Sequence, residues 1–507
     1  MTLQPTRVPP IRAIPHEVVP DGTLMLVLDL CHELWAAHVS YCHWKSNDML
    51  ARSATGENDL DLLVHRSDAQ SFAAVLARLG FRQAVAPGGR EHPGVSHHYA
   101  LDRASGSFVH VHAHFLLVLG DDTTKNFRLP IEVPYLESVS CDHLFPTPSP
   151  DFELAVFVVR MMLKHATWDA VAIGKGRIGD AERRELAWLL ERADPDTTRA
   201  IVAEHLPGIG LDLWQRCLES VHDPHGLGAR LLLGQKVLRA MRPHSRRPLL
   251  LDTWLRSYRR FAWGTRRYVF RVPVRKRLVH IGGTVAIAGG DGAGKSTAVA
   301  GAVGWLCGPL LVHRVHLCKP RPSVLTLAVK GPMYVGRSLG LLPGTGASVD
   351  PRTATPADFP GRAWMVWHLM TARDRLRVYR KARRVSDAGG IVVSDRWPLP
   401  QIRCMDGPRT TWLLDHPERF GRITLALARA ERRIYAQIGP PDVLAVLRID
   451  PEIAVARRHD EESSYVRARN AEVRDVDWSA THAVVLDAAA PSDTVLRGIQ
   501  QAIWERL

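Results

Sequence analysis

The chain has few of the features that mark secreted or membrane-spanning proteins. Its 507 residues contain only seven cysteines, which are scattered and form no C-x-x-C pair, so neither a disulfide framework nor a cysteine zinc site is expected. No apolar run approaches the ~20 residues that a bilayer-spanning helix requires. Residues 1–22 lack the basic-then-apolar order of a signal peptide and are predicted to be a flexible leader. These absences predict a cytoplasmic protein without a membrane span.

Acidic side chains are also in short supply, with 52 Asp and Glu against 66 Lys and Arg and a net charge of +14. Between residues 254 and 277 no acidic residue occurs at all. Trp254, Tyr258 and Phe261 recur there at helical spacing, which predicts a basic linker helix over residues 254–280. We expect its aromatic side chains to pack on a neighbouring domain and its arginines to face solvent. Contact with anionic lipid or nucleic acid is the alternative, although we do not expect a nucleic-acid partner.

The most informative segment is TVAIAGGDGAGKST, residues 284–297. An apolar run with strand character leads into Gly289-x-x-x-x-Gly294-Lys295-Ser296, the pattern of a phosphate-binding P-loop. The predicted nucleotide-binding residues are Gly289, Gly290, Asp291, Gly292, Ala293, Gly294, Lys295, Ser296 and Thr297. Glycines let backbone N–H groups close around phosphate oxygens, Lys295 reaches the β- and γ-phosphates, and the Ser296 hydroxyl holds Mg²⁺. The segment therefore predicts a site for ATP and Mg²⁺.

Downstream of this loop, helical and apolar strand-like segments alternate, as in an α/β unit with a parallel sheet. The run from residue 390 to Asp395 reads as a buried strand ending in an acid, and ligands gather at the carboxyl ends of such strands. Asp395 is therefore expected to reach the metal. A helix over residues 369–384 carries Arg375, and arginines around residues 457–469 are typical of a mobile lid over the phosphates.

Several motifs of this half resemble the thymidylate kinase family of P-loop kinases. They are Asp291-Gly-Ala-Gly-Lys-Ser-Thr297, Ser394-Asp395-Arg396, Pro441-Asp442, Asp450-Pro451-Glu452 and Leu486-Asp487-Ala488, and the resemblance covers roughly residues 281–507. It implies a five-stranded parallel sheet and transfer of the γ-phosphoryl group of ATP to a monophosphate.

The resemblance also implies roles for individual residues. Asp291, Arg375 and Arg396 would bind the acceptor. Lys295, Asp395 and Arg396 would serve catalysis, and Asp395 would also bind the metal. An arginine of the lid, among Arg457, Arg467 and Arg469, would cover the transferred group, and Arg467 is the predicted catalytic residue of the three. Three departures leave the acceptor open. Ala288 stands where the family has an acid, and residues 316–321 and 398–409 replace segments that recognise thymidylate. We therefore expect a dTMP-like nucleoside monophosphate or a related phosphorylated small molecule.

The N-terminal third carries Lys45-Ser46 followed, after twelve residues, by Asp59-Leu-Asp61. This arrangement resembles the polymerase-β type of nucleotidyltransferase and implies an α+β domain over residues 23–150. Two aspartates two apart on a strand share a face and could hold Mg²⁺. However, Lys45 stands where that family has glycine, and a strand with alternating histidines replaces a third acid. Those histidines are either metal ligands or part of a polar strand face, and we favour a polar strand face because no acid or cysteine lies near them in sequence.

Residues 151–253 show apolar positions at helical steps and predict a helical extension without a motif. The predicted fold is thus an α/β P-loop kinase with a five-stranded parallel sheet, preceded by an α+β nucleotidyltransferase-like domain and a helical region. The predicted activity is ATP-dependent phosphoryl transfer. The alternatives are an ATP-binding regulatory switch and nucleotidyl transfer at Asp59 and Asp61, and a homodimer is left open.

Overall fold

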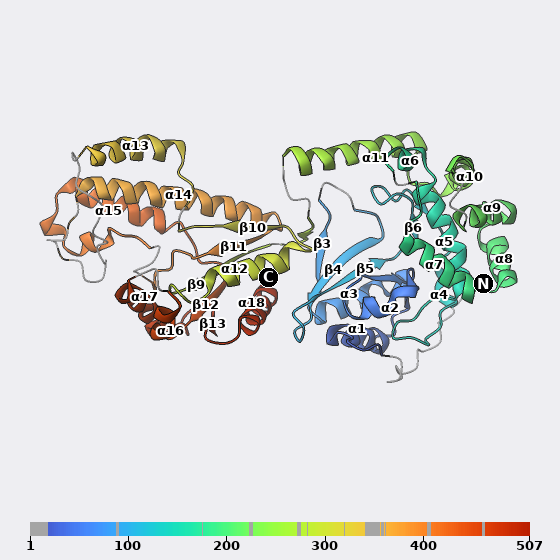
Figure 1. The fold of residues 1–507 in the computed structure, drawn as a ribbon, viewed down its shortest axis with the longest axis horizontal. Helices are drawn as coiled ribbons and strands as arrows, with labels where there is room; N and C mark the ends of the chain where they lie inside the picture. The colour runs from blue at the N-terminus through green and yellow to red at the C-terminus, as the bar shows by residue number, and fades with distance from the viewer. Residues whose placement is uncertain are drawn as a thin grey trace. The chain divides into compact units, whose positions relative to one another are not determined.

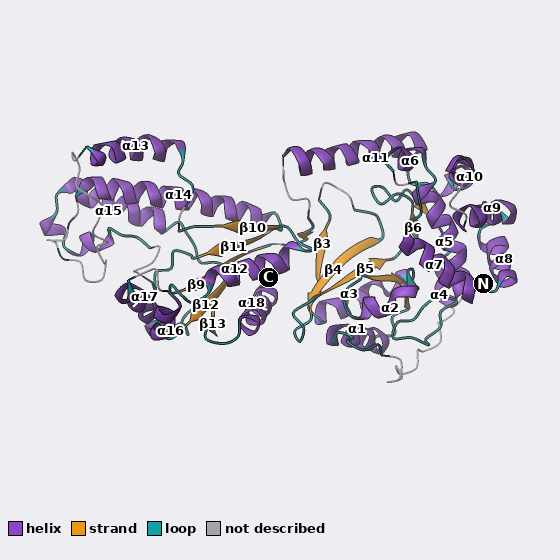
Figure 2. Ribbon diagram, in the orientation of Figure 1, coloured by secondary structure: helices purple, strands orange, loops and turns teal. Residues whose placement is uncertain are grey.

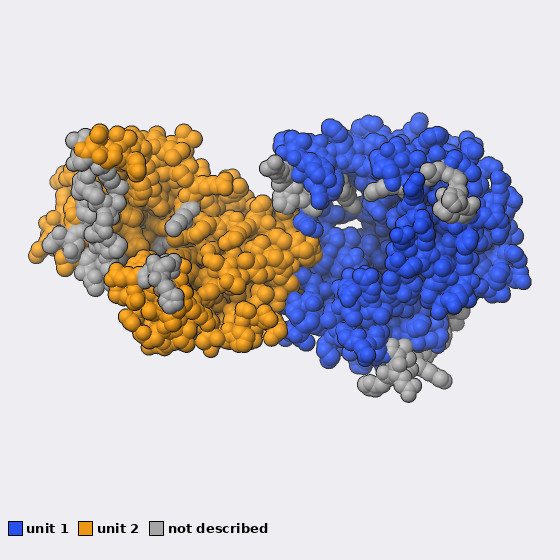
Figure 3. Space-filling view, in the orientation of Figure 1, with its two compact units in different colours: residues 1–276 blue, residues 277–507 orange. Residues whose placement is uncertain are grey.

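The structure is a computed structural model that forms two compact units, residues 1–276 and 277–507 (Figure 3). It describes residues 19–87, 91–174, 176–222, 227–270, 275–280, 282–318, 320–339, 355, 359, 361–402, 407–458 and 462–507. Most of the predicted leader, residues 1–18, lies outside the described residues. None of the helices in the described part of the chain combines the length and the apolar character needed to cross a membrane.

The first unit is built on a mixed sheet with the strand order β1-β2-β5-β4-β3 (Figure 1). The strands are β1 (Tyr41–His43), β2 (Leu60–Val64), β3 (Arg82–Val85), β4 (Val95–Leu101) and β5 (Phe108–His114). β2 and β5 are parallel, and the other pairs are antiparallel. Because side chains alternate along a strand, Leu60 and Leu62 of β2 face a core that α1 (Met25–Ala36) and α3 (Ala69–Arg78) cover. Asp61 faces the opposite side of the sheet.

The helical extension belongs to the same unit and is organised around α5 (Pro150–His165). Ser149 caps this helix by accepting the Phe152 N–H, and a proline occupies the first turn, where its missing N–H leaves no partner unsatisfied. The remaining helices of this unit are α2 (Leu50–Ala54), α4 (Glu132–Glu137), α6 (Trp168–Ala172), α7 (Asp180–Arg192), α8 (Pro195–His205), α9 (Leu211–His222), α10 (Leu227–Ala240) and α11 (Leu249–Gly264), with short strands β6 (Val118–Leu119) and β7 (Phe127–Arg128). α5 is buried on nearly all sides because helices α6 to α10 pack around it.

The basic segment forms α11 and a following turn of π-helix, but its orientation is the reverse of the predicted one. Trp254 and Phe261 are 61% and 75% exposed, whereas Arg256 is 5% exposed. Arg256 and Arg260 each pair with Asp169, at 3.0 and 2.7 Å. The expectation that the arginines face solvent is therefore wrong for Arg256 and Arg260, whereas Arg266 and Arg267 are exposed as expected. Carboxylates from distant parts of the unit meet them and compensate the cost of burying their charge.

The second unit holds a parallel sheet with the order β10-β11-β9-β12-β13 (Figure 2). Its strands are β9 (Gly283–Gly289), β10 (Val312–Val315), β11 (Ile391–Asp395), β12 (Val443–Arg448) and β13 (Ala483–Asp487), after a short β8 (Arg277–Leu278). This confirms the predicted five-stranded parallel sheet. Its helices are α12 (Lys295–Cys307), α13 (Val324–Ser338), α14 (Arg362–Asp387), α15 (Arg422–Tyr435), α16 (Pro451–Arg457), α17 (Ser463–Asp475) and α18 (Ser492–Arg506).

Strand order and helix placement together position the site. The central strand β9 is buried along its whole length because helices cover both faces of the sheet, which is why its sequence is continuously apolar. β9 lies between β11 and β12. After β9 the chain forms β10 and β11 on one side of it, and then β12 and β13 on the other side. A crevice forms at the carboxyl end of the strands at such a point.

Candidate functional site

The loop between β9 and α12 has the backbone that its glycines permit. Gly292 and Gly294 adopt φ values of 85° and 78°, a region that other residues rarely enter. A side chain at Gly290 would lie 2.0 Å from Asn470 Oδ1, so a neighbouring helix also closes on the loop. The predicted P-loop segment thus forms a tight loop that opens into the N-terminus of α12, a position suited to an anion.

Lys295 lies folded over this loop. Its ammonium group donates to the Gly290 carbonyl at 2.5 Å and lies 3.5 Å from Asp291 Oδ1. Burial, reinforced by the nearby Arg396, lowers the pKa of Lys295. The Lys295 charge is therefore held in a confined and already cationic setting.

Asp291 is the centre of the charge network. It accepts from Arg396 Nη2 at 2.6 Å and from Arg469 Nη1 at 2.5 Å, and its backbone carbonyl accepts from Asn470. Burial alone would raise the pKa of Asp291, but the surrounding lysine and arginines outweigh it and hold the pKa below the ordinary value. The carboxylate thus gathers two arginines beside the phosphate loop.

Arg396 has an unusual backbone that serves this contact. Its φ is 69°, in the left-handed region, which costs a non-glycine residue about 1–2 kcal/mol. The Ser394 hydroxyl donates to the Arg396 carbonyl at 2.7 Å, and the Arg396 N–H donates to Ile287 of β9. Strained residues that a scaffold holds in place occur most often at functional sites, and here the strain turns the guanidinium toward Asp291.

Asp395 ends β11 and is 8% exposed. Among the described residues its Oδ1 atom is buried without a hydrogen-bond partner, and a buried unsatisfied carboxylate oxygen calls for a physical explanation. Asp395 and Ser296 both line the cavity described below. Oxygen ligands of this kind suit a hard divalent cation such as Mg²⁺, so the predicted metal-binding pair fits the role assigned to it.

The loop opens into a cavity of about 750 Å³. Among the described residues, six arginines, one lysine and two carboxylates line it. The described lining residues are Asp291, Gly292, Gly294, Lys295, Ser296, Thr297, His316, Cys318, Trp367, His368, Thr371, Arg375, Asp395, Arg396, Arg409, Arg457, Arg458, Tyr465 and Arg469. This excess of positive charge favours a strongly anionic occupant.

The far wall of the cavity is made by α14 and its neighbours. Arg375 donates to the carbonyls of Leu317 and Cys318, at 3.1 and 2.9 Å, and to the Tyr435 hydroxyl. These contacts fix the guanidinium, which still lines the cavity. The buried Glu431 accepts the backbone N–H groups of residues 409 and 410, and it thereby holds the segment that brings Arg409 to the cavity.

The lid arginines are arranged differently from the prediction. Arg467 does not belong to the cavity lining and pairs with Glu452 at 2.6 Å, where both side chains are largely exposed. Arg457 and Arg469 line the cavity, and Arg469 stacks over the Tyr465 ring at 3.9 Å. A catalytic role of Arg467 stays a prediction, and Arg469 is the better-placed residue.

Sequence reasoning missed part of the far wall. Trp367, Thr371 and Arg375 lie at four-residue steps on α14, so they share one helical face, and all three line the cavity. The sequence shows that spacing, but of these three residues only Arg375 was predicted to belong to the site. Arg458 belongs to the arginines around residues 457–469 that were predicted to form a lid, whereas Arg409 carried no such local signal.

In the first unit, both predicted aspartates face histidines of β5. Asp59 contacts His110 at 2.6 Å, and Asp61 contacts His112 at 2.8 Å and Lys45 at 3.0 Å. No acid lies near the histidines in sequence, but parallel pairing places Asp61 directly opposite His112. Burial lowers the pKa of His112 to about 4 despite the Asp61 carboxylate beside it.

Comparison with known proteins yields two relatives from Escherichia coli K12. The chain is 28% identical to "Uncharacterized ATP-binding protein YghR" over 232 residues, which cover 44% of this chain and 88% of that protein. It is 26% identical to "Uncharacterized ATP-binding protein YghS" over 229 residues, which cover 44% of this chain and 93% of that protein. No family model matches the chain.

Proposed function

We propose that the second unit binds ATP with Mg²⁺ and transfers the γ-phosphoryl group to a small molecule that already carries a phosphate. The observation that carries this proposal is the shared cavity. A phosphate loop with its lysine, a carboxylate at the end of the adjacent strand and six arginines all open onto one space. Binding one triphosphate would require fewer cationic side chains than the cavity contains. The remaining positive charge suits a second anionic substrate.

The loop residues would bind the triphosphate of ATP. Lys295 exchanges the Gly290 carbonyl for oxygens of the β- and γ-phosphates, while backbone N–H groups of the loop and the α12 N-terminus face the same anion. Ser296 and Asp395 would hold Mg²⁺, which neutralises phosphate charge when bound. The two E. coli relatives, whose names describe them as ATP-binding proteins, support the ATP part of the proposal.

The arginines would hold the acceptor and stabilise the transferred group. Phosphoryl transfer depends mainly on positioning and on positive charge around a dispersed anionic transition state. Arg396 and Arg375 are the proposed acceptor-phosphate ligands, since planar guanidinium groups bind phosphate in a bidentate manner. Asp291 positions Arg396 and Arg469 before substrates arrive, and Arg469 covers the transferred group.

The acceptor is proposed to be a nucleoside monophosphate, dTMP-like in size, or a related phosphorylated molecule. Trp367 and His368 supply aromatic surface in the cavity, which suits a base or sugar ring. Lys330 lies 4.0 Å from the centre of the Trp367 ring and fixes its face.

The decisive experiment incubates the purified full chain with ATP, Mg²⁺ and a panel of nucleoside monophosphates and sugar phosphates. ADP release and the phosphorylated product are both measured, which separates transfer from hydrolysis. Lys295→Ala should lower turnover by about 100-fold or more. Lys381→Ala is the control, because Lys381 is exposed on α14 and does not line the cavity.

Two outcomes would contradict the proposal. Equal turnover in wild-type protein and a folded Lys295→Ala variant would show that the loop is not the catalytic site. Tight ATP binding with no transfer to any acceptor would favour the ATP-binding regulatory switch instead. In that case Arg396→Ala should change ATP affinity or conformation rather than an acceptor KM.

A further inference from the structure

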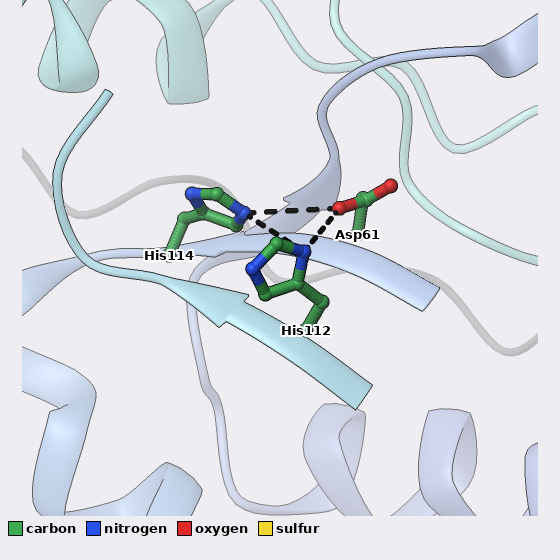
Figure 4. A group of neighbouring side chains, drawn as sticks. All are labelled: Asp61, His112 and His114. Atoms are coloured by element: carbon green, nitrogen blue, oxygen red, sulfur yellow. Dashed lines mark hydrogen bonds and ion pairs between the residues drawn. The ribbon is translucent and has the colours of Figure 1, made fainter. Parts of the chain in front are cut away.

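A histidine-rich sheet face in the first unit lies outside the proposed kinase site. His112 and His114 are two residues apart on β5, so both project from the same face of the sheet. β2 runs parallel to β5 and places Asp61 opposite His112. β4 runs antiparallel on the other side and stacks His97 on His112, with ring centres 4.4 Å apart. Figure 4 shows Asp61, His112 and His114 directed toward one another.

The distances within this group match those around a metal ion. Asp61 Oδ1 lies 2.8 Å from His112 Nδ1 and 3.7 Å from His114 Nε2, and the two nitrogens are 3.4 Å apart. A tetrahedral ion with ligands at about 2.0–2.2 Å separates its ligand atoms by roughly 3.3–3.6 Å. The three atoms therefore need to move by only about half an ångström to surround such an ion.

We propose that Asp61, His112 and His114 bind a divalent transition-metal ion, with Zn²⁺ as the first candidate. Imidazole nitrogens suit Zn²⁺ and other first-row transition metals, whereas Mg²⁺ prefers oxygen ligands. This site differs from the Asp59 and Asp61 pair expected from sequence, because Asp59 turns to His110. It is independent of the proposed phosphoryl transfer in the second unit.

Burial and packing preorganise the three ligands. The His114 side chain is fully buried, and those of His112 and Asp61 are 12% and 14% exposed. Trp44 packs against His114 at 5.1 Å between ring centres, and His97 packs against the face of His112. Rings held in this way lose little conformational freedom when a metal binds, which strengthens binding.

Lys45 supplies the compensating charge in the absence of a metal. Its ammonium group lies 3.0 Å from Asp61 Oδ1, the same oxygen that would ligate the ion. Lys45 also lines a neighbouring cavity of about 390 Å³, so it has room to withdraw. A divalent ion would repel this ammonium group, and Lys45→Met should therefore tighten metal binding roughly tenfold. A purely structural histidine cluster gives no reason for that gain.

The test titrates the chelator-treated full chain with ZnCl₂ by calorimetry and with CoCl₂ by visible absorption. We expect one tight equivalent and a tetrahedral cobalt spectrum. His112→Ala should weaken binding on the order of 100-fold, and His98→Ala is the matched control, since His98 pairs opposite Val111 on the other face of the sheet. A melting curve establishes that each variant is folded.

His114→Ala is a second variant, although its full burial makes misfolding a concern. His112→Ala, which alters a partly exposed side chain, keeps the test decisive if His114→Ala fails to fold. Binding that is equal in wild-type and His112→Ala protein would overturn the site, because surface histidines would then account for it. A preference for MgCl₂ over ZnCl₂ would overturn the assigned metal class, and weaker binding in Lys45→Met would overturn the role of Lys45.

Discussion

The strained backbone at Arg396 allows stability and activity to be separated at one position. Arg396→Gly and Arg396→Ala both remove the guanidinium that contacts Asp291 at 2.6 Å. Only glycine, however, adopts the observed φ of 69° without steric penalty. Both variants should therefore lose phosphoryl transfer to a similar extent, while their folding stabilities differ. The comparison isolates the backbone term, because the lost ion pair is the same in each variant.

The expected difference follows from two opposing terms. The left-handed conformation costs alanine about 1–2 kcal/mol. The Arg396→Gly variant in turn loses about 0.4–1 kcal/mol of stability, because glycine gives the unfolded chain greater conformational freedom. Arg396→Gly should thus be more stable than Arg396→Ala by about 1 kcal/mol, or about 2–4 °C in the melting temperature of a unit of this size.

The assay combines scanning calorimetry of the full chain with ADP release in the presence of the acceptor. Equal melting temperatures for the two variants would refute the strain argument at this position. Retained turnover in Arg396→Gly would refute the assignment of the guanidinium to acceptor binding. Glycine and alanine variants that both lose turnover but differ in stability would support strain held in place for function.

Three further predictions concern other parts of the chain. Asp395→Asn should lower Mg²⁺-dependent ADP release by about 100-fold with little change in melting temperature, because Asp395 Oδ1 makes no hydrogen bond among the described residues. Glu153→Gln should flatten the pH dependence of urea unfolding, because burial raises the pKa of Glu153 to about 8. The contribution of Glu153 to wild-type stability is fully present below the pKa that Glu153 has in the unfolded chain. It is lost by up to about 1.4 kcal/mol per pH unit as the pH rises toward 8. A flat wild-type profile would contradict this. Gly234→Ala should destabilise the first unit by about 1–3 kcal/mol in urea, because the added carbon would lie 2.1 Å from the Ala166 carbonyl; unchanged stability would show that α10 shifts freely.

The tight glycine loop between β9 and α12 could be predicted because its determinants are contiguous. A strand, glycines, Lys295 and Ser296 follow one another within a dozen residues, and the backbone geometry they need is local. The same holds for Asp395, whose place at the end of an apolar run predicted its position at the end of β11. Alternation of helices and apolar strands likewise predicted the parallel sheet.

Side-chain direction at longer range was not accessible in this way. The sequence offered several lid arginines, but only the packing of α17 on the loop shows that Arg469 faces Asp291 while Arg467 turns to Glu452. The periodicity of α11 predicted two faces and could not tell which one is buried. The choice depended on Asp169, far away in sequence, because a buried arginine needs a carboxylate partner.

Features built from neighbouring residues can be read from the sequence of this protein, above all the tight glycine loop on a parallel α/β sheet. Which distant groups meet becomes apparent only in the folded chain. Strand pairing brings Asp61 beside His112 across about fifty positions, and no local pattern encodes that pairing. The register of a sheet is set by the burial of whole faces, so a cluster built across strands becomes visible only when the chain is folded.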